Sequence, residues 1–583
     1  MYRLGIIGTG RIAERMVKTG LTGLNVSCEC VYNPHLESAR RFAEANHIDR
    51  FTDNLDTLAA YTDVIYVASP HETHRDYTEY MLNSGKHVLC EKPMALKKED
   101  GDRLYKLAKE KKLVLKEAVK TAFCPGFNEL AAIVESGKIG RVIDVEAAFT
   151  RLTPINTREY VNPVYNGSML EFGSYGLLPV MRFLGTDYKN VTFNSIRSQD
   201  GVDVYTKAYV EYEGGMATVK SGLGAKTEGQ LVISGTLGYI IVPSPWWMTR
   251  KFQVRFEDSS IVENYEYPYE GSGLQYEMAV FLASIMDNSF NAICVTEKES
   301  VAMASVMEKF LDWNTPQWEQ GQKSFAERLK KTDMPKVWAH RGCSMRYPEN
   351  TLLSFKAAAE VPGITGIELD VQFTRDNEIV VFHDENVSRV TDGDKAVKDY
   401  SLEEIKKLRI YAGKDSNGEN TYTTVPTLSE VLELLKPYCE KNGLLINIEL
   451  KTSVERYKGI EEKTYNLVKS YGLEKYIVYS SFLPESVAIM KEIDANCKTG
   501  ILAVYLDECE SMAGKVKADA LHPAAVTLGY DIPEEFDGMP VRVWNWDEPF
   551  FEDGRTLIGD NLYRYRGFGA TDIITNVPEN YLK

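Results

Sequence analysis

The sequence predicts an α/β protein that contains a doubly wound parallel sheet, an α+β domain with an open-faced antiparallel sheet, and a (β/α)8 barrel. Strand-like and helix-like runs alternate in residues 1–120 and again in residues 335–583, as in parallel sheets covered by helices. Residues 121–312 instead contain strand-like runs separated by turns with glycine, which favours antiparallel strands. A chain of 583 residues is long enough for roughly three to four domains.

The first domain, residues 1–120, repeats a short apolar run followed by an amphipathic run. The pairs are RLGIIGTG with RIAERMVKTGL, VSCECVYN with ESARRFAEAN, DVIYVASP with RDYTEYMLNSG, and HVLCEKP with KEDGDRLYKLAKEK. Each apolar run has the length of a buried strand, and each amphipathic run has the spacing of a surface helix. We therefore expect a doubly wound parallel sheet.

The second domain, residues 121–312, mixes both kinds of segment. DVEAAFTRL, KAYVEYEGGMATVKSG and QLVISGTLGYIIV are typical of antiparallel strands, whereas SMLEFGSYGLLPVMRFLG and YEMAVFLASIMD are typical of helices. Residues 313–334 are polar and mostly lack a strand pattern. We expect them to form a linker, with room for a short helix.

The third domain, residues 335–583, has eight candidate parallel strands: VWAHRG, GIELDVQ, IVVFHD, LINIELK, IVYSSF, TGILAV, VRVWNW and DIITNVP. Helical segments such as TLLSFKAAAE and TLSEVLELLK lie between them. Eight strands over about 250 residues are typical of a (β/α)8, or TIM, barrel. ADALHPAAVTL at 518–528 is a ninth candidate, and we interpret it as a partial strand or a loop.

The composition excludes several classes of protein. The formal net charge of -17 disfavours nucleic-acid binding, which needs a basic surface. No run of 18 apolar residues is present, so we expect no membrane insertion, and the first residues lack the pattern of a secretory signal. The nine cysteines are scattered and form no CxxC pair, which fits a cytoplasmic protein rather than a disulfide framework or a zinc site.

The first chemical motif is GxGxxA, formed by Gly8, Gly10 and Ala13 between a predicted strand and a predicted helix. The first glycine permits a tight turn, the second lets the backbone approach a pyrophosphate, and the small third residue lets helix and strand pack closely. The helix N-terminus then faces the phosphates. We therefore expect a Rossmann domain that binds NAD or NADP.

The choice between NAD and NADP stays open. An acidic residue at the end of the second strand usually holds the ribose 2′-hydroxyl of NAD. This chain has Asn33 there, and Arg40 and Arg41 follow several residues later.

Four further residues predict a hydride-transfer site. Glu91 and Lys92 end the fourth predicted strand, at the sheet edge where open α/β sheets bind ligands. Glu171 and Tyr175 are four residues apart on a predicted helix and therefore share a face. Lys92 could orient a nicotinamide and a substrate hydroxyl. Tyr175 could exchange a proton with the substrate, since a nearby lysine cation favours the phenolate.

The motifs GTGRIA, SPHETH, EKP and NGSMLEFGSYGLLPVMRFLG, in this order and spacing, resemble the glucose–fructose oxidoreductase/inositol dehydrogenase (Gfo/Idh/MocA) family over about residues 1–312. KEAVKTAFCPGF and GTLGYIIVPSPWW look closest to its dihydrodiol dehydrogenase-like branch. The resemblance implies an NAD(P)-dependent oxidoreductase, a homo-oligomer that pairs through its sheets, Lys92 as the catalytic lysine, and His74 against the cofactor.

The chain departs from the family pattern at two places. Many members have Asp and His where this chain has Glu171 and Tyr175, although some branches have Tyr at the second position. In the dihydrodiol-like branch the segment near residue 120 usually carries an aromatic residue and an arginine, whereas this chain has Lys120 followed by Thr and Ala. Lys120 would suit an anionic or polyhydroxy substrate, or it is simply a solvated lysine.

Ionisable side chains also gather at the ends of predicted barrel strands. They are His340, Arg341, Glu368, Asp370, His383, Glu449 and Lys451. Residues two apart on a strand share a face, and barrel active sites lie at the carboxyl ends of the strands. Carboxylates there suit a hard cation such as Ca²⁺ or Mg²⁺, two imidazoles can divide general acid and base catalysis, and the arginine and lysine could hold a phosphate.

HRG, then PENT after five residues, with ELDVQFT, VVFHD, IELK and IITNVP downstream, resembles the glycerophosphodiester phosphodiesterase family over about residues 335–583. The resemblance implies cleavage of glycerophosphodiesters to glycerol 3-phosphate and an alcohol. It makes His340 and His383 the acid–base pair, makes the three carboxylates the metal ligands, and assigns the phosphate to Arg341 and Lys451. The usual ITD is ITN here, with Asn576.

The sequence thus predicts a bifunctional enzyme that hydrolyses a glycerophosphodiester and oxidises or reduces a polyol or sugar. The released head group is one possible substrate of the second reaction. Two alternatives remain for residues 1–312. They could use bound NAD for transient oxidation during an elimination or epimerisation, or they could form a non-catalytic, cofactor-sensing scaffold.

Overall fold

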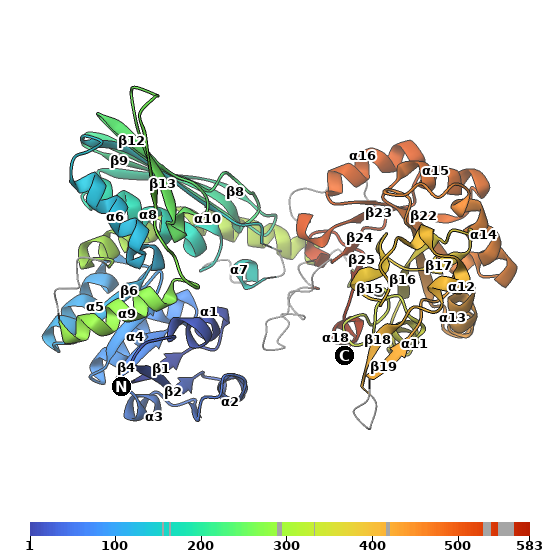
Figure 1. The fold of residues 1–583 in the computed structure, drawn as a ribbon, viewed down its shortest axis with the longest axis horizontal. Coiled ribbons are helices and arrows are strands. Elements are labelled where there is room, and N and C mark those ends of the chain that lie inside the picture. The colour runs from blue at the N-terminus through green and yellow to red at the C-terminus, as the bar shows by residue number, and fades with distance from the viewer. Residues whose placement is uncertain are drawn as a thin grey trace. The chain divides into compact units, whose positions relative to one another are not determined.

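The computed structural model describes residues 1–153, 157–161, 165–287, 294–330, 333–414, 420–528, 538–545, 562 and 565–582. The chain forms two compact units, whose boundary falls between Gln322 and Lys323 (Figure 1). Among the described residues, no helix is long and apolar enough to cross a membrane. All nine cysteines are free thiols.

The first sheet is parallel and has six strands among the described residues, so the doubly wound prediction is confirmed. Its strands, in spatial order, are β3 (Arg50–Thr52), β2 (Val26–Tyr32), β1 (Tyr2–Ile7), β4 (Val64–Val67), β5 (His87–Glu91) and β6 (Leu115–Ala118). Its helices are α1 (Arg11–Arg15), continued by a π-helical turn at Met16–Gly20, α2 (Leu36–Ala45), α3 (Leu55–Tyr61), α4 (His74–Asn83) and α5 (Lys98–Glu110). The short strands β3 and β6 extend the edges beyond the four predicted runs.

Two apolar clusters cover the two faces of this sheet. In one of them Leu4 and Ile6 of β1 pack with Leu274, Met278 and Phe281 of α9 (Leu274–Met286). A helix that comes late in the unit therefore completes the first sheet. Because α9 lies against the sheet, its side chains can reach the carboxyl ends of the strands.

The second sheet has eight strands among the described residues. In spatial order they are β14 (Val262–Glu266), β13 (Lys251–Phe256), β12 (Gly238–Val242), β11 (Leu231–Gly235), β7 (Val142–Thr150), β10 (Gly215–Gly222), β9 (Asp203–Tyr212) and β8 (Asn190–Arg197). The expectation of an antiparallel sheet is wrong at one pair, because β7 and β10 are parallel. Parallel neighbours require a crossover connection instead of a hairpin, and the chain between β7 and β10 provides one that includes α8.

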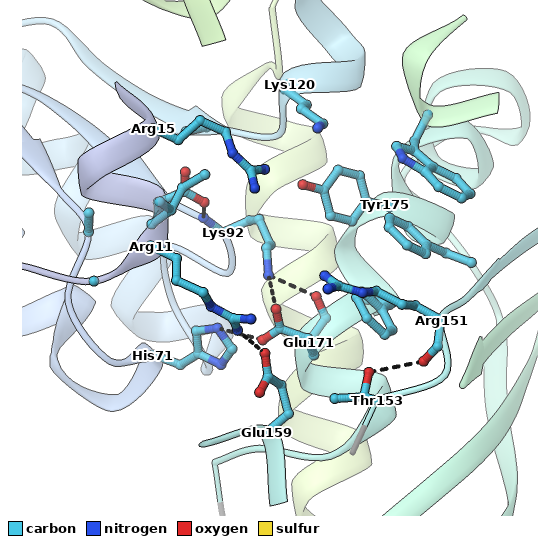
Figure 2. Close-up of a pocket in the computed structure, with 18 of the residues that line it drawn as sticks. Arg11, Arg15, His71, Lys92, Lys120, Arg151, Thr153, Glu159, Glu171 and Tyr175 are labelled. Carbon is cyan, nitrogen blue, oxygen red and sulfur yellow. Dashed lines mark hydrogen bonds and ion pairs between the residues drawn. The ribbon is translucent and has the colours of Figure 1, made fainter. Parts of the chain in front are cut away.

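Helix α8 (Ser168–Leu184) connects this sheet to the first one. Its N-terminus is held by Asp203, whose Oδ2 accepts hydrogen bonds from Ser168 Oγ at 2.8 Å and the Met169 amide at 2.9 Å. A negative charge at this end also complements the helix dipole. Glu171 and Tyr175 project from α8 into a pocket (Figure 2).

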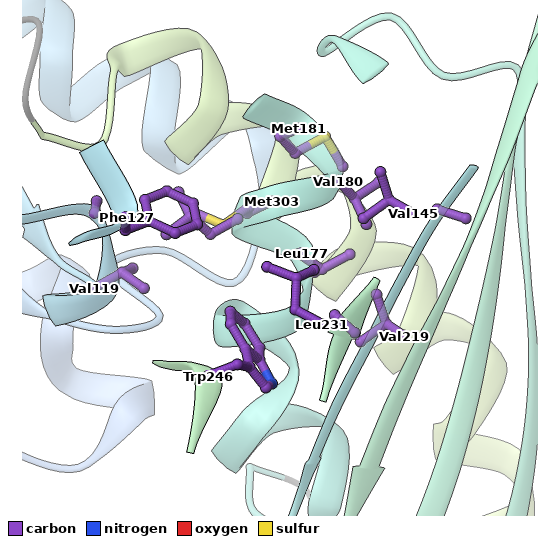
Figure 3. Close-up of a cluster of buried hydrophobic side chains, with 14 of the residues drawn as sticks. Val119, Phe127, Val145, Leu177, Val180, Met181, Val219, Leu231, Trp246 and Met303 are labelled. Carbon is purple, nitrogen blue, oxygen red and sulfur yellow. The ribbon is translucent and has the colours of Figure 1, made fainter. Parts of the chain in front are cut away.

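The opposite side of α8 is buried against the second sheet. Leu177, Val180 and Met181 lie in one apolar cluster with side chains of the sheet strands, and Trp246 closes the cluster (Figure 3). Gly176 allows the close approach, because a Cβ there would lie 2.4 Å from Val219 Cγ1. The packing therefore fixes the helix that carries Glu171 and Tyr175.

The remaining helices of this unit are α6 (Pro125–Glu135), α7 (Arg158–Val161) and α10 (Glu297–Leu329). The structure differs from the expected linker with a short helix, because α10 runs without interruption through most of residues 313–334. Its first half is apolar and packs in the cluster of the second sheet through Met303, Met307 and Phe310. Helical hydrogen bonding continues past that buried half into the polar segment.

The second unit contains the barrel. Its parallel strands, in spatial order, are β23 (Ala520–Pro523), β22 (Lys498–Ala503), β21 (Ile477–Ser481), β20 (Leu445–Leu450), β16 (Gly366–Phe373), β15 (Lys336–His340), β25 (Asp572–Thr575) and β24 (Arg542–Trp544). Parallel bridges Leu521–Val541 and Ala524–Trp544 join the two ends of this order. The (β/α)8 prediction is confirmed.

Two strand assignments within the barrel were wrong. IVVFHD does not form a barrel strand, because β17 (Ile379–Val381) pairs antiparallel with the end of β16 as a hairpin. ADALHPAAVTL, interpreted as a partial strand or loop, supplies the barrel strand β23 instead. Both segments are short and apolar, so periodicity alone does not distinguish a barrel strand from a hairpin strand.

The barrel helices are α11 (Leu352–Ala359), α12 (Leu402–Ile405), α13 (Leu428–Asn442), α14 (Ile460–Tyr471), α15 (Pro484–Ile493), α16 (Leu506–Val516) and α18 (Pro578–Tyr581). A small hairpin of β18 (Ile410–Lys414) and β19 (Asn420–Thr423) adds to them. Side chains of α11, α13 and α14 pack with β16 and β20 in one buried cluster. This cluster supports the two strands that carry the predicted carboxylates.

Candidate active sites

The first unit contains a pocket of about 700 Å³ at the carboxyl ends of the first sheet's strands. Gly10, Lys92 and Tyr175 line it, together with residues from the second sheet such as Phe149 and Trp247 (Figure 2). It therefore lies where open parallel sheets bind ligands. Of the residues predicted for this site, Gly8, Ala13 and Asn33 do not line the pocket.

The GxGxxA loop has the geometry expected for a dinucleotide. Gly8 has φ +111°, and a Cβ there would lie 2.4 Å from the carbonyl oxygen of Ala68. At Gly10 a Cβ would meet no protein atom within 4 Å, which leaves room for a phosphate beside the start of α1. Ala13, a residue of α1, is fully buried. These residues fit the pyrophosphate of a nicotinamide cofactor.

Asn33 lies beside this loop at the end of β2. Its Nδ2 donates to Thr9 Oγ1 at 2.9 Å, and its Oδ1 accepts from the His35 amide at 2.9 Å. Arg40 forms ion pairs with Glu37 and Glu44 on its own helix. Neither arrangement distinguishes a ribose hydroxyl from a 2′-phosphate, so the choice between NAD and NADP stays open.

His74 is buried and connects two loops of the pocket. Its Nδ1 lies 2.9 Å from the carbonyl oxygen of Pro93, and its Nε2 lies 2.8 Å from that of Ser69. Burial lowers the pKa of His74 to about 4, although the two contacts with carbonyl oxygens act to raise it. His74 therefore holds the loop after β4 against the loop that carries Lys92.

Lys92 is only 7% exposed, and its ammonium group is held by α8. Nζ donates to the carbonyl oxygen of Glu171 at 2.8 Å and lies 3.8 Å from Glu171 Oε1. Burial alone would raise the pKa of Glu171, but the Lys92 and Arg158 cations outweigh it and lower the pKa. Glu171 therefore stays ionised and fixes the lysine in the pocket.

His71 is a site residue that the sequence patterns did not single out. Its Nε2 lies 3.7 Å from Glu171 Oε2, and its Nδ1 lies 3.2 Å from the Tyr165 carbonyl oxygen. Burial, followed by the Lys92 cation, holds its pKa well below the ordinary value. The SPHETH segment contains both His71 and His74, and only the register of the 3-10 turn at His71–Thr73 decides which one faces Glu171.

The expected activation of Tyr175 by Lys92 differs from the structure. Lys92 Nζ lies over the Tyr175 ring, 5.8 Å from its centroid, rather than beside the hydroxyl. Burial and the carboxyl groups of Glu91 and Glu277 hold the pKa of Tyr175 well above its usual value. Tyr175 is therefore a phenol that can donate a proton, and these neighbours do not favour the phenolate.

Two buried carboxyl groups complete the pocket. Glu91 Oε1 accepts a hydrogen bond from the Tyr66 hydroxyl at 2.5 Å. Glu277 of α9 is fully buried, and neither of its carboxyl oxygens has a hydrogen-bond partner among the described residues. Burial and the nearby Glu91 hold the pKa of Glu277 well above its ordinary value. The pattern YEMAVFLASIMD indicated only a core helix and gave no sign of this residue.

The second unit contains a pocket of about 300 Å³ at the carboxyl ends of the barrel strands. Its polar lining includes His340, Arg341, Glu368, His383 and Glu449. Its other side is largely apolar and is formed by Phe482, Leu502, Val504, Trp544 and Ile574. Charged groups therefore face an apolar wall across a small cavity.

Three predicted metal ligands converge at this pocket. Oxygen atoms of Glu368, Asp370 and Glu449 lie within 4.8 Å of one another, and all three residues are buried. Burial, with the charges of Asp370 and Glu449, holds the pKa of Glu368 well above its ordinary value. Among the described residues, Asp370 Oδ1 has no hydrogen-bond partner, and Lys451 Nζ lies 3.9 Å from it. Crowded carboxylates with an unused oxygen fit a divalent cation with oxygen ligands, such as Ca²⁺ or Mg²⁺.

Asn350 orients Asp370, a role that the sequence did not reveal. Its Nδ2 donates to Asp370 Oδ2 at 2.8 Å. Asn350 has φ +55°, and the next residue, Thr351, caps α11. The PENT segment thus places an amide against a metal-site carboxylate, as a supporting hydrogen bond does in many metal sites.

Arg341 and Lys451 lie beside the carboxylates. Arg341 Nε is 3.4 Å from Asp370 Oδ2, and Lys451 Nζ is 3.0 Å from Glu449 Oε1. Arg341 has φ +55°, and Gly342 follows at φ +84° with its Cα close to Ser354. The HRG turn therefore directs the guanidinium into the pocket, as predicted.

His340 is the last residue of β15, and its ring is hydrogen-bonded to Asn576, which directly follows β25. Its Nδ1 contacts Asn576 Oδ1 at 2.7 Å, and Ser344 Oγ lies 2.9 Å from the same oxygen. Since an amide oxygen only accepts, Nδ1 carries the proton and Nε2 keeps its lone pair. Burial, followed by Arg341, lowers the pKa of His340 to about 3. The neutral ring can therefore accept a proton at Nε2.

His383 reaches the same pocket from the loop after β17, not from the end of a barrel strand. Its Nδ1 lies 2.6 Å from Asp384 Oδ1. Asp384 is held by Arg389, and Arg389 also binds Glu349. Gln372 of β16 fixes the loop, because its Nε2 donates to the carbonyl oxygens of residues 382–384. The two histidines thus have different partners, a neutral amide and a carboxylate.

Comparison with known families agrees with these two sites. Residues 340–580 match the model of the glycerophosphoryl diester phosphodiesterase family. Residues 2–119 match an oxidoreductase family with an NAD-binding Rossmann fold, and residues 127–241 match the GFO/IDH/MocA C-terminal domain.

Curated relatives resemble each half separately. A glycerophosphodiester phosphodiesterase of Caldanaerobacter subterraneus is 39% identical over 252 residues, which are 42% of this chain and 96% of that protein. An NADP-dependent scyllo-inositol 2-dehydrogenase of Bacillus subtilis is 28% identical over 319 residues, 53% of this chain and 96% of that protein. A trans-1,2-dihydrobenzene-1,2-diol dehydrogenase of Xenopus laevis is 29% identical over 321 residues, again 53% and 96%. The chain therefore belongs to the glycerophosphoryl diester phosphodiesterase family through its barrel, and its first unit resembles the GFO/IDH/MocA oxidoreductase family over the residues that match the two models.

Proposed function

We propose that the chain is a bifunctional enzyme. The barrel hydrolyses a glycerophosphodiester to glycerol 3-phosphate and an alcohol, and the first unit oxidises or reduces a polyol or sugar with NAD or NADP. The observation that carries the first activity is the convergence of Glu368, Asp370 and Glu449 with two histidines of different hydrogen bonding. The second activity rests on the pocket that joins the glycine loop to Lys92 and Tyr175.

In the barrel, Glu368, Asp370 and Glu449 would hold a divalent cation. When bound, such a cation supplies Lewis-acid polarisation of a phosphoryl oxygen. Arg341 and Lys451 lie beside these carboxylates and bind the remaining phosphate oxygens. The apolar wall that includes Phe482 and Trp544 excludes water from the other side, and this strengthens the charge interactions.

The two histidines divide the proton transfers. His340 accepts a proton from the attacking oxygen nucleophile at Nε2, because Asn576 holds the other proton at Nδ1. His383 is oriented by the Asp384 carboxylate, which attracts the protonated ring, and donates a proton to the leaving alcohol oxygen. One P–O bond forms and one breaks, and the net reaction consumes one water molecule.

The test of hydrolysis measures glycerol 3-phosphate release by the full chain with Ca²⁺, Mg²⁺ or EDTA. Glu449→Gln is expected to reduce release on the order of 100-fold and to weaken the metal-induced rise in Tm. Glu455→Gln is the matched control, since Glu455 pairs with Lys398 at the surface. Equal activity of Glu449→Gln and wild type would refute the assignment.

In the first unit, Gly8 and Gly10 would hold the pyrophosphate of a nicotinamide cofactor, which would supply hydride exchange with the substrate carbon. Lys92, fixed by Glu171, lies where it can bind the reacting oxygen. Tyr175 is a phenol under these neighbours, so it donates a proton to a carbonyl oxygen when a substrate is reduced. In oxidation the same oxygen returns its proton to the protein or to water.

The test of redox activity titrates the full chain with NADP⁺ and NAD⁺ and then measures cofactor turnover with polyols. Lys92→Ala is expected to abolish turnover while cofactor affinity stays within about threefold, because Lys92 acts on the substrate oxygen. Retained cofactor without net turnover would indicate an elimination or epimerisation. Absence of cofactor binding would refute the proposal for this unit.

A further inference from the structure

The pocket of the first unit has a charge opposite to that of the whole chain. The sequence contains 67 Lys and Arg against 84 Asp and Glu. The pocket is lined by the cations Arg11, Arg15, Lys92, Lys120, Arg151, Arg158 and Lys226, but by only four carboxyl groups, Glu91, Glu159, Glu171 and Glu277. A local excess of positive charge in an acidic protein points to an anionic ligand.

The carboxyl groups of the pocket have other partners. Glu159 pairs with Arg11, and Glu171 lies near Lys92 and Arg158. Glu91 accepts a hydrogen bond from a tyrosine hydroxyl, and burial holds the pKa of the Glu277 carboxyl well above its usual value. None of the four is therefore an ion-pair partner for the remaining cations.

Three cations of the pocket stay without a counterion among the described residues. The side chains of Arg15, Lys120 and Arg151 have no ion pair or hydrogen bond with a carboxylate there. Within the described part of the chain, Lys226 Nζ has one hydrogen bond, to the carbonyl oxygen of Thr150 at 3.2 Å. Part of this charge can serve the cofactor's pyrophosphate near Gly10, whereas Lys120 lies at the end of the pocket away from Arg11 (Figure 2).

Arg15 and Lys120 converge at this end. Figure 2 shows both side chains directed toward the region that the Tyr175 hydroxyl faces. Burial lowers the pKa of Lys120, the Glu277 carboxyl partly offsets this, and the Arg15 cation lowers the pKa again, so the two cations repel each other. An anion between them would replace the lost hydration and remove the repulsion. Glu277, which lines the same pocket with both oxygens unused, can donate a hydrogen bond to such a group.

We propose that the redox substrate is a phosphorylated polyol whose phosphate is bound by Lys120 and Arg15. This inference rests on the oxidoreductase activity proposed above and adds the substrate class. The carbinol of the substrate then lies toward Lys92 and Tyr175. The carbinol C–H bond breaks with transfer of a hydride to NAD(P)⁺, its O–H proton goes to the protein or water, and a ketose phosphate forms.

The barrel provides a source for this ligand. Hydrolysis of any glycerophosphodiester releases a phosphorylated polyol, glycerol 3-phosphate, beside the neutral alcohol. The cationic pocket favours the phosphorylated product over the alcohol. An inositol phosphate or a sugar phosphate has the same recognisable chemistry, so the test must separate these sources.

The test compares matched pairs of substrates with the full chain and a saturating cofactor. The pairs are glycerol 3-phosphate with glycerol, and myo-inositol 1-phosphate with myo-inositol. At least one phosphorylated member is expected to have a kcat/KM about tenfold or more above that of its neutral partner. Inorganic phosphate is expected to inhibit competitively against that substrate.

The variant Lys120→Met keeps most of the side-chain volume and removes the charge. It is expected to reduce this preference by about tenfold or more, through KM rather than kcat, while NADP⁺ affinity stays unchanged. Lys111→Met is the matched control, because Lys111 is exposed at the end of α5.

Each outcome decides between the two proposals. Turnover of neutral polyols that equals or exceeds that of their phosphates would overturn this inference and leave the oxidoreductase function standing. A phosphate preference that survives Lys120→Met would also overturn it. Cofactor binding without turnover of any member would overturn both, since no alcohol would then be oxidised at Lys92.

Discussion

Replacing Asp384 with Asn tests the division of roles between the two barrel histidines. The carboxylate contacts His383 Nδ1 at 2.6 Å and is held in place by Arg389. Asn keeps the shape of the side chain but removes the charge that attracts the protonated ring. A charge-assisted hydrogen bond of this kind contributes about 1.5–3 kcal/mol, so kcat for hydrolysis is expected to fall by about 10- to 150-fold.

The loss should appear in kcat rather than in KM. Asp384 does not line the pocket, so substrate contacts with Arg341 and Lys451 stay intact. The assay is glycerol 3-phosphate release at several diester concentrations with a fixed, saturating divalent metal. Asp392→Asn is the matched control, because Asp392 lies in the same loop region and pairs with Arg409 at the surface, where an ion pair contributes little.

The acid role of His383 would be refuted if Asp384→Asn kept kcat within about threefold of wild type while its Tm was unchanged. A fall of equal size in Asp392→Asn would show instead that the loop, and not the carboxylate, is responsible.

Three further predictions concern stability, cofactor and metal. Burial raises the pKa of Glu117 from 4.5 to about 7, so its contribution to the free energy of unfolding is complete below pH 4.5 and is lost as the pH rises through 7. The wild type should therefore lose about 3 kcal/mol of stability from this group between pH 5 and pH 9, and Glu117→Gln should not. Urea unfolding at several pH values measures this, and parallel pH profiles of the two proteins would contradict it. Gly8→Ala should weaken NADP⁺ binding about tenfold or more, because its Cβ would lie 2.4 Å from a backbone oxygen. Gly23→Ala, with open space around its Cβ, should leave NADP⁺ binding unchanged. Equal NADP⁺ affinities of the two variants in a cofactor titration would refute this. Asn350→Ala should weaken metal binding by about 10- to 100-fold, since Asp370 loses its orienting amide, and an unchanged calorimetric affinity would contradict that role.

The sequence predicted the fold where local patterns determine it. The four strand–helix pairs of residues 1–120 and most of the barrel strands have the lengths and periods of buried elements. The exchange of β17 and β23 was not predictable, because a three-residue apolar run carries no mark of its pairing partner. Likewise, the parallel pairing of β7 with β10 depends on how α8 crosses the sheet.

The site residues divide in the same way. Residues inside motifs, such as Lys92 and Glu368, line the two pockets, and their roles there stay predictions. The residues that the sequence analysis missed act through contacts that no motif specifies. Asp384 stands next to a predicted histidine, but its position depends on Arg389, and Glu277 is brought to the pocket by α9, a helix from late in the unit that packs on the first sheet. Such contacts leave no spacing pattern in the chain.

The measurement that tests the central claim most directly is metal-dependent release of glycerol 3-phosphate by the full chain from a panel of glycerophosphodiesters. The structure predicts release that EDTA abolishes, that Glu449→Gln loses and that Lys92→Ala retains, because the two sites use separate residues. Absence of release from every diester with both Ca²⁺ and Mg²⁺ would contradict the proposed phosphodiesterase site.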